Sequence, residues 1–204
     1  MMDMTTNKRT LQKAATRAAV ISAAGRVFRS KGYAAATIAV IAEEAKVSAG
    51  TVLNAAPTKI ALLNLVMAEE FSALGADSDT LRAGLSGDFR TAVAALLELH
   101  LNRHNETLAM MGPLLAECWM SEGEEFERFY ANMDRAWGPV RAVLDEAKAD
   151  GRLAASVEVD ALVKFLQDAY LGVLRRCASN ELSLMQASEL LRRRLAFVFE
   201  PVCA

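Results

Sequence analysis

The stretch TIAVIAEEAKVSAGTVLNAAPTK, residues 37–59, decides how this chain folds. Its apolar side chains predict one short helix over residues 38–45 and, after a three-residue turn, a second over residues 49–55. Two short helices joined by such a turn are typical of a helix-turn-helix. Thr37 and Ser48 stand where the two helices would begin, and their side-chain oxygens can each accept a hydrogen bond from an unpaired first-turn amide.

Two helices of this size have too little apolar surface to fold alone, so the preceding segment must support them. We expect that segment to be a helix over residues 10–31, because Ala18, Ile21, Ala24, Val27 and Phe28 recur at the helical period. Gly32 would end it, since glycine takes the left-handed conformation after a helix without strain. The polar residues before residue 10 are expected to form an arm.

Charge is divided unevenly along the 204 residues. Residues 1–60 carry nine Lys or Arg and three acidic side chains, a net charge of +6, so the total of −2 leaves −8 for the remainder. A basic first third joined to an acidic body suits a protein whose one end meets phosphate. Random charge scatter on solvated faces is the alternative, and the coincidence with the helix-turn-helix favours a nucleic-acid partner.

The residues around this motif follow a recognisable order and spacing. They are Arg17 to Ala24, Val27-Phe28, Lys31-Gly32-Tyr33, Thr37, Ile41-Ala42, Val47-Ser48, Gly50-Thr51, Pro57-Thr58-Lys59 and Leu62. This set resembles the N-terminal domain of the TetR family of one-component transcriptional regulators. Gly151-Arg152-Leu153, Val159-Asp160 and Tyr170-Leu171-Gly172 are similar to the looser pattern of that family's C-terminal half.

The resemblance implies an all-α fold: a helix-turn-helix DNA-binding domain over residues 1–60 and a larger helical ligand-binding and dimerisation domain over residues 61–204. It implies a homodimeric repressor that binds a palindromic operator in double-stranded DNA and is released by a small apolar effector, with no cofactor. The alternative is a TetR-like protein with weakened or lost DNA binding that acts through protein–protein interaction.

The residues expected to meet DNA lie on and around the second short helix. By the family pattern, Thr37, Thr51 and Lys59 contact the phosphate backbone, and Ala49, Gly50 and Asn54 lie near the bases. Asn54 could read adenine through two hydrogen bonds. The full predicted set is Thr37, Lys46, Ser48, Ala49, Gly50, Thr51, Leu53, Asn54 and Lys59.

Three positions depart from the family pattern. Leu53 stands where an aromatic side chain usually grips phosphate, Ala55-Ala56 where His-Phe is frequent, and Lys46 where the turn usually has glycine. A left-handed Lys46 would cost about 1 kcal/mol relative to glycine. Leu53 cannot donate a hydrogen bond to phosphate, so we expect weakened or unusual operator binding. We do not expect binding to be lost, because counterion release by Lys and Arg still supplies nonspecific affinity.

The remaining chain reads as a series of amphipathic helices. The expected ranges are residues 59–74, a break or a mild kink at 75–80, then 89–103, 106–121, 122–149, 159–178 and 182–199. The last two have apolar faces wider than one intramolecular stripe, which favours pairing with a second copy over a purely monomeric core. The predicted dimer-interface residues are Phe165, Leu166, Ala169, Val173, Leu184, Leu191 and Leu195.

Methionine and aromatic side chains gather in the middle of the chain. Such side chains make adaptable apolar cavities, although at helical spacing they also form ordinary cores. The residues predicted to bind a ligand are Met110, Met111, Leu115, Trp119, Phe126, Phe129, Tyr130, Met133 and Trp137.

Metal-dependent and enzymatic functions have little support in the sequence. His100 and His104, spaced i, i+4, could hold a metal with Cys118 or Glu98, but a solvated pair near a helix end is the preferred interpretation. The three cysteines have no metal-type spacing. There is no glycine-rich phosphate loop or recognisable nucleophile constellation, so an enzyme is not expected. Without an apolar signal segment or long apolar run, we expect a cytoplasmic protein.

Overall fold

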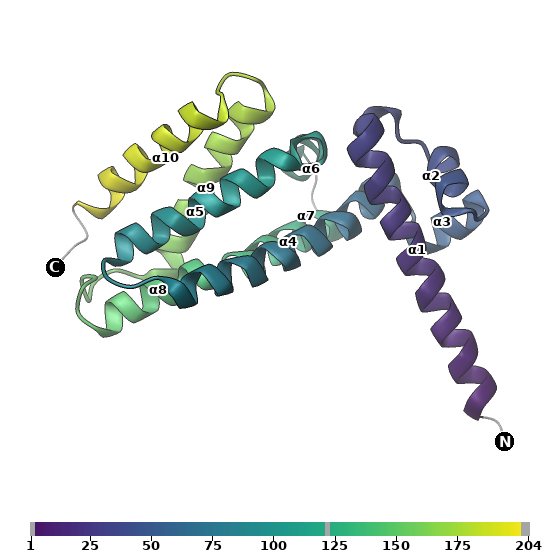
Figure 1. The fold of residues 1–204 in the computed structure, drawn as a ribbon, viewed down its shortest axis with the longest axis horizontal. Coiled ribbons are helices and arrows are strands. Elements are labelled where there is room, and N and C mark those ends of the chain that lie inside the picture. Colours follow the sequence, from purple (N-terminus) through teal and green to yellow (C-terminus); the bar gives the residue numbers. More distant parts are fainter. Residues whose placement is uncertain (1–2, 121–122, 201–204) are drawn as a thin grey trace. The chain divides into compact units, whose positions relative to one another are not determined.

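The computed structural model describes residues 3–120 and 123–200, with side chains described for residues 8–117 and 123–200. Within these ranges the chain forms ten helices and no strand, which confirms the predicted all-α fold (Figure 1). They are α1 (Asp3–Ala35), α2 (Ile38–Ala45), α3 (Ala49–Ala55), α4 (Lys59–Gly84), α5 (Phe89–Glu106), α6 (Leu108–Met120), α7 (Glu124–Ala136), α8 (Gly138–Ala149), α9 (Val159–Ala178) and α10 (Leu184–Phe199). In the described part of the chain no single helix is long and apolar enough to cross a membrane; by length and composition only the bent pair α3 and α4, at 61°, could do so together.

The helices pack into two compact units. We call residues 1–69 with 113–129 the N-terminal unit, and residues 70–112 with 130–204 the C-terminal unit. Helices α4, α6 and α7 therefore supply residues to both. The division at residue 60 into a DNA-binding domain and a ligand-binding and dimerisation domain stays a prediction.

In the N-terminal unit, α1 is the support that the helix-turn-helix needs. It contacts both α2 and α3, and its buried side chains are Val20, Ile21, Ala23, Ala24, Val27 and Phe28. Ala18, predicted to belong to this stripe, is exposed instead. The helix also begins earlier than expected, at Asp3, where an arm was predicted, and Gly32 (φ 74°, ψ 163°) interrupts it as predicted.

The helix-turn-helix has the predicted bounds, and both caps are confirmed. The Thr37 hydroxyl accepts from the amide of Val40 at 3.2 Å, and the Ser48 hydroxyl accepts from the amide of Thr51 at 3.1 Å. Each bond satisfies one amide that has no partner within its helix. Between the helices, Lys46 has the left-handed conformation (φ 56°, ψ 42°) that this turn requires.

The first difference from the sequence-based prediction is the length of α4. The polar run Gly75–Thr80, expected to break the helix, lies inside it. Tertiary contacts explain this: the Ser78 hydroxyl is fully buried and 3.1 Å from Nε2 of His100, and Asp77 forms an ion pair with Arg103. These partners outweigh the low helix propensity of the run.

The second difference is a break in the long helix predicted over residues 122–149. It consists of α7 and α8, which meet at Trp137, Gly138 and Pro139. Proline at the start of α8 has no amide to donate back to α7, and it is well suited to the first turn of a new helix. The apolar period is the same on both sides, which is why periodicity alone predicted one helix.

Helix α5 is central to the C-terminal unit. It contacts α8, α9 and α10, and its N-cap is Asp88, whose carboxylate accepts from the amide of Arg90 at 3.3 Å. Its buried side chains are Phe89, Val93, Leu96, Leu97, His100, Leu101 and His104. Helix α9 has the predicted bounds, and α10 starts two residues later than predicted, at a capping box formed by Ser183 and Gln186. Two histidines therefore lie on the buried, otherwise apolar face of α5.

The left-handed turn gives a stability test. We expect Lys46→Gly to raise the free energy of unfolding by about 0.5–1 kcal/mol, because glycine adopts this conformation without a Cβ clash. Urea denaturation measures the change. The control is Glu43→Gly, three residues earlier on an exposed, helical position, which should lower stability by about 1 kcal/mol. Destabilisation by both substitutions would contradict the left-handed turn.

Candidate nucleic-acid interface and ligand-binding core

Helix α3 is anchored on one side and open on the other. Val52 is fully buried and Ala56, at the C-cap, is 2% exposed, so these two hold the helix against its unit. Ala49, Gly50 and Asn54 are exposed, as the predicted base-facing positions require, and Leu53 is 46% exposed. The exposed side of α3 thus presents the amide of Asn54, two small residues and Leu53, an apolar side chain with no hydrogen-bond donor.

Several residues predicted to contact the phosphate backbone are already engaged within the protein. The Thr51 hydroxyl lies 2.9 Å from the Ser48 hydroxyl, and Thr37 caps α2. Lys59 donates from Nζ to the carbonyl oxygen of Tyr33 at 2.9 Å, with its ammonium 4.2 Å from the centre of the Tyr33 ring. A lysine held this way still has N–H groups to offer, but its position is set by Tyr33. Lys46 is exposed.

The structure adds a basic row on α1 that was not among the predicted DNA-binding residues. Arg9, Lys13 and Arg17 recur every four residues, so they share one face of the helix. With Thr51 and Asn54 of the recognition helix they line a groove of about 350 Å³. The spacing of these three residues in the sequence could have predicted that they share a face of the helix. It could not have predicted that this face lies beside α3.

The cations of the two units differ in their partners. In the C-terminal unit, Arg and Lys side chains are widely engaged in ion pairs, such as Arg82 with Glu146, Lys164 with Asp134 and Arg192 with Glu98. Within the described residues, Arg9, Lys13 and Arg17 form no ion pair. Their charges are therefore uncompensated on the surface, which is typical of a surface that binds an anionic polymer.

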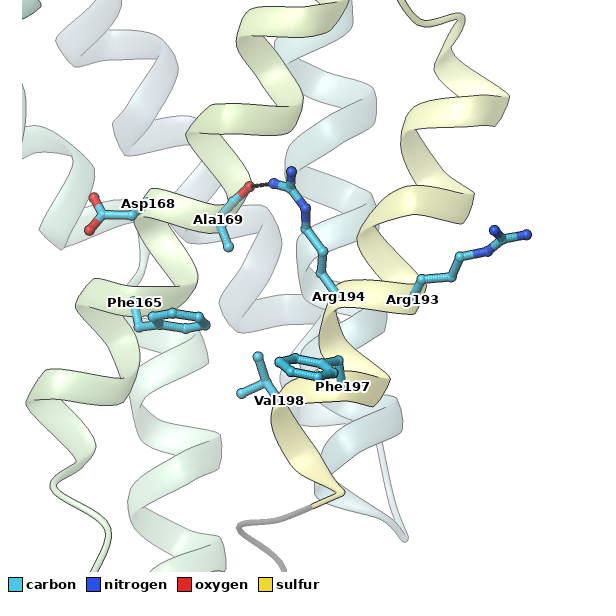
Figure 2. Close-up of a pocket in the computed structure, with 7 residues that line it drawn as sticks. All are labelled: Phe165, Asp168, Ala169, Arg193, Arg194, Phe197 and Val198. Atoms are coloured by element: carbon cyan, nitrogen blue, oxygen red, sulfur yellow. Dashed lines mark hydrogen bonds between the residues drawn. The ribbon is translucent and has the colours of Figure 1, made fainter.

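Helices α9 and α10 border an open apolar groove of about 470 Å³ (Figure 2). Phe165 from α9 and Phe197 from α10 point into the space between the helices, and they are 54% and 79% exposed. Figure 2 also shows Arg194 crossing from α10 to donate to the carbonyl oxygen of Ala169. Gly172 permits this crossing, since a Cβ there would lie 3.3 Å from the guanidinium.

The predicted dimer residues divide into two groups. Phe165 and Ala169 line the groove, and Leu184 is half-buried. Leu166, Val173, Leu191 and Leu195 are instead buried within their own chain. Both helices thus use one face for the core, and the outer face carries Phe197 and Val198, which are not in the predicted interface set.

The residues predicted to bind a ligand are mostly core residues. In the C-terminal unit Met110, Met111, Met133 and Trp137 are buried and Tyr130 is half-buried; in the N-terminal unit Leu115 and Phe129 are buried and Phe126 is 36% exposed. Trp119 lies outside the described side chains, as does Cys118.

The prediction that His100 and His104 are solvated is wrong. Their exposed fractions are 0% and 6%. The reason is that α5 runs through the core of its unit, so even its last turns are covered. Glu98, the suggested co-ligand of a metal, is bonded to Ser188 and Arg192 on α10, and the described residues contain no group of three or more His, Cys, Asp or Glu that could hold a metal.

Burial keeps both imidazoles neutral. It lowers the pKa of His100 to about 3, with a further contribution from His104, and the pKa of His104 to about 4, with a further contribution from Arg103. Tyr170, whose hydroxyl is 2.6 Å from Nδ1 of His104, has a pKa raised well above its usual value by burial and by Cys177. The phenol therefore keeps its proton at neutral pH.

The fold and these surfaces define a helix-turn-helix protein with a larger helical C-terminal part. Residues 20–66 match the family described as "Bacterial regulatory proteins, tetR family". A comparison with curated protein sequences found no match. The match at residues 20–66 confirms the resemblance to the TetR family that the motif residues suggested.

Solved structures support the same fold over nearly the whole chain. FadR of Thermus thermophilus, a TetR family transcriptional repressor in complex with lauroyl-CoA, is similar at 20% identity, with coverage of 92% of this chain and 95% of that one and a TM-score of 0.76. FadR of Bacillus subtilis in complex with stearoyl-CoA shares 15% identity, with 87% and 96% coverage and a TM-score of 0.70. RolR in complex with resorcinol shares 21% identity, with 92% and 89% coverage and a TM-score of 0.69. The chain thus has the fold of TetR-family transcriptional regulators, which are not enzymes.

The buried histidines predict a pH dependence of stability. Below about pH 6.5 the unfolded chain takes up a proton at each histidine while the folded protein does not, so stability falls with pH. Between pH 7.5 and 5.5 the two histidines together should lower the free energy of unfolding by about 2–3 kcal/mol. Urea denaturation at a series of pH values measures this.

Substitution provides the control. Asp134 and Glu181 have pKa values lowered from 3.8 and 4.5, so the stability that they contribute is lost only below that window. His104→Asn should remove about half of the pH effect between 7.5 and 5.5. Unchanged stability of the wild-type protein across the window would contradict neutral, buried histidines.

Proposed function

We propose that this protein is a TetR-like transcriptional regulator that binds a palindromic operator as a homodimer, represses transcription and is released by a small effector. The observation that carries the proposal is the uncompensated basic row Arg9, Lys13 and Arg17 beside the exposed face of α3. A capped, anchored recognition helix beside cations that form no ion pair with the described residues is what major-groove binding with phosphate contacts requires.

The basic row supplies what α3 lacks. Leu53 offers no hydrogen bond to phosphate, and Lys59 and Thr51 are engaged by Tyr33 and Ser48. Three cations spaced by four residues extend over about 12 Å along α1, a length that covers more than one phosphate of a DNA strand. The row therefore offsets the departures from the family pattern that predicted weakened binding.

In this proposal two copies associate through the outer face of α9 and α10. Phe165 and Phe197 are large, exposed and adjacent to one another across the groove, and association would remove their surface from water. In this proposal the two recognition helices of the dimer enter consecutive major grooves, which are about 34 Å apart.

The effector is proposed to act on that spacing. The similar regulators were solved with lauroyl-CoA, stearoyl-CoA and resorcinol, so this fold accommodates ligands of very different size. A ligand that favours a dimer with mis-spaced recognition helices would lower operator affinity by population shift. The predicted Met and aromatic residues of the C-terminal unit are the proposed lining.

A second candidate is suggested by the exposed Leu53 on α3 and the 64% exposed Leu11 on α1. Large exposed apolar side chains such as these suit a protein partner. In this alternative the helix-turn-helix binds a protein and no operator exists.

The decisive experiment is selection of bound fragments from genomic DNA, followed by anisotropy titrations of the selected site against salt. We expect a two-fold symmetric site. We expect Arg9→Gln, Lys13→Gln and Arg17→Gln together to reduce the slope of log affinity against log salt by up to about 5, near 0.9 for each of six phosphate contacts in a dimer.

The matched control removes the same charge elsewhere. Arg152→Gln, Lys164→Gln and Arg175→Gln alter exposed, ion-paired cations of the C-terminal unit, and should leave the slope unchanged. No selected fragment, or an affinity indifferent to salt, would favour the protein-interaction alternative.

The dimer face has its own test, in which sedimentation equilibrium measures dimer dissociation. Phe197→Ser should raise the dissociation constant by at least about tenfold, because a large apolar contact is lost. Met185→Ser is the control, since Met185 is 80% exposed on α10 but does not line the groove. Equal effects of both substitutions, or a monomeric wild-type protein, would count against this interface.

A further inference from the structure

The apolar groove between α9 and α10 has a charged side chain on each of its two rims. Asp168 lies on the α9 rim and Arg193 on the α10 rim, with Phe165 and Phe197 between them (Figure 2). Both charged side chains point away from the groove, and Figure 2 shows their charged ends at nearly the same level along the helices. We call Asp168 and Arg193 the rim charges. The face is therefore an apolar centre flanked by one negative and one positive rim.

The rim charges have bonding capacity left over within the part of the chain that the structure describes. Asp168 is exposed and forms no hydrogen bond or ion pair with the described residues. Arg193 has a 76% exposed side chain and donates from Nε to Glu189, one turn earlier on α10, at 2.8 Å. A guanidinium has five N–H donors in a planar fork, so Arg193 can bind a second carboxylate with the outer edge of that fork.

A bond across the groove fixes the spacing of the two rims. Arg194 extends from α10 and donates to the carbonyl oxygen of Ala169, which follows Asp168 on α9 (Figure 2). Helices α9 and α10 also pack directly against each other. A face whose geometry is set before association loses little conformational entropy on binding, and this favours a partner of complementary shape and charge.

Two-fold symmetry restricts what this face can meet in a second copy of the chain. In an isologous interface both copies use the same patch, and residue i meets residue j while j meets i. A two-fold axis that runs along the groove, between the helices, places α9 of one copy over α10 of the other at the same level. Each Asp168 then faces the partner's Arg193, and each Phe165 faces the partner's Phe197.

The same two charges disfavour the other face-to-face arrangement. An axis that runs across the groove at the level of the rim charges places α9 over α9, so that Asp168 faces the partner's Asp168 and Arg193 faces the partner's Arg193. Like charges brought together at an interface repel, which suppresses that arrangement. The rim charges thus distinguish two dimer geometries that both cover the aromatic centre of the groove.

We propose that a second copy of this chain docks on the groove with the two-fold axis along α9 and α10, and that Asp168 forms an ion pair with the partner's Arg193 on both rims. The inference rests on the homodimer of the proposed function and adds what sets its geometry. Burial of the apolar centre supplies affinity, and the two symmetric ion pairs supply orientation. Because the ion pairs lie at the rim, their effect falls as the salt concentration rises.

The test reverses each charge separately and then mixes the two variants. Asp168→Arg and Arg193→Asp each place like charges on both rims of a homodimer, so each should raise the dissociation constant about tenfold at low salt. In an equimolar mixture, the heterodimer of the two variants has opposite charges on both rims. Sedimentation equilibrium should therefore show the mixture associating about tenfold more tightly than either variant alone.

The controls separate the rim pairing from other effects of charge. The double variant Asp168→Arg, Arg193→Asp should dimerise like the wild-type protein, and its recovery also shows that neither substitution prevents folding. Asp145→Arg makes the same change of charge at an exposed position of α8 that does not line the groove, and should leave dimerisation unchanged. At about 1 M salt, where the screening length is about 3 Å, all these variants should approach the wild-type dissociation constant.

The outcomes separate this inference from the proposed function. A wild-type dimer that Phe197→Ser weakens, but that neither charge reversal weakens, would overturn the rim pairing and leave the homodimer standing. Charge-reversed variants that gain nothing from mixing would do the same. A monomeric wild-type protein would overturn the proposed homodimer together with the rim pairing, and would assign the groove to a different partner. Absence of an operator would refute repression and leave the dimer geometry unaffected.

Discussion

The structure depends on the apolar stripe of α1. Helices α2 and α3 are eight and seven residues long, below the length at which an isolated helix is stable in water. Buried side chains from Val20 to Phe28 give them a surface to pack on, and Val52 of α3 is fully buried in return. Because α3 is held from behind by few apolar contacts, its exposed side is free for polar and small residues, which is the property that DNA recognition needs.

The same helix has a second role in its first half. Side chains from residue 8 to residue 15 are all exposed, so this part of α1 contributes charge rather than core. Acidic residues are scarce in the first sixty residues and frequent afterwards, and the ion pairs follow that distribution. In the C-terminal unit most cations are engaged in ion pairs such as Arg82 with Glu146, whereas Arg9, Lys13 and Arg17 form none with the side chains that the structure describes. The basic composition of the first sixty residues thus gives the first half of α1 a positively charged surface that favours an anionic partner.

Sequence reasoning worked where local rules decide the outcome. The bounds of α2, α3 and α9, the caps Thr37 and Ser48 and the left-handed turn at Lys46 depend on neighbouring residues, so they could be predicted. The continuation of α4 through Gly75–Thr80 could not, because it depends on Ser78 meeting His100, 22 residues later. For the same reason His100 and His104 were predicted to be solvated. Their i, i+4 spacing near a helix end carries no information about the other helices that cover α5.

The polar groups in the core show how tertiary contacts override local conformational preference. Ser78 stabilises a helical conformation that its own neighbours disfavour, and it does so by bonding a histidine that is itself kept neutral by burial. Replacing this network by leucine-like side chains would remove the cost of the unpaired nitrogens, and cores filled that way are commonly at least as stable. A core that retains two imidazoles with one free nitrogen each therefore carries a cost that packing does not require.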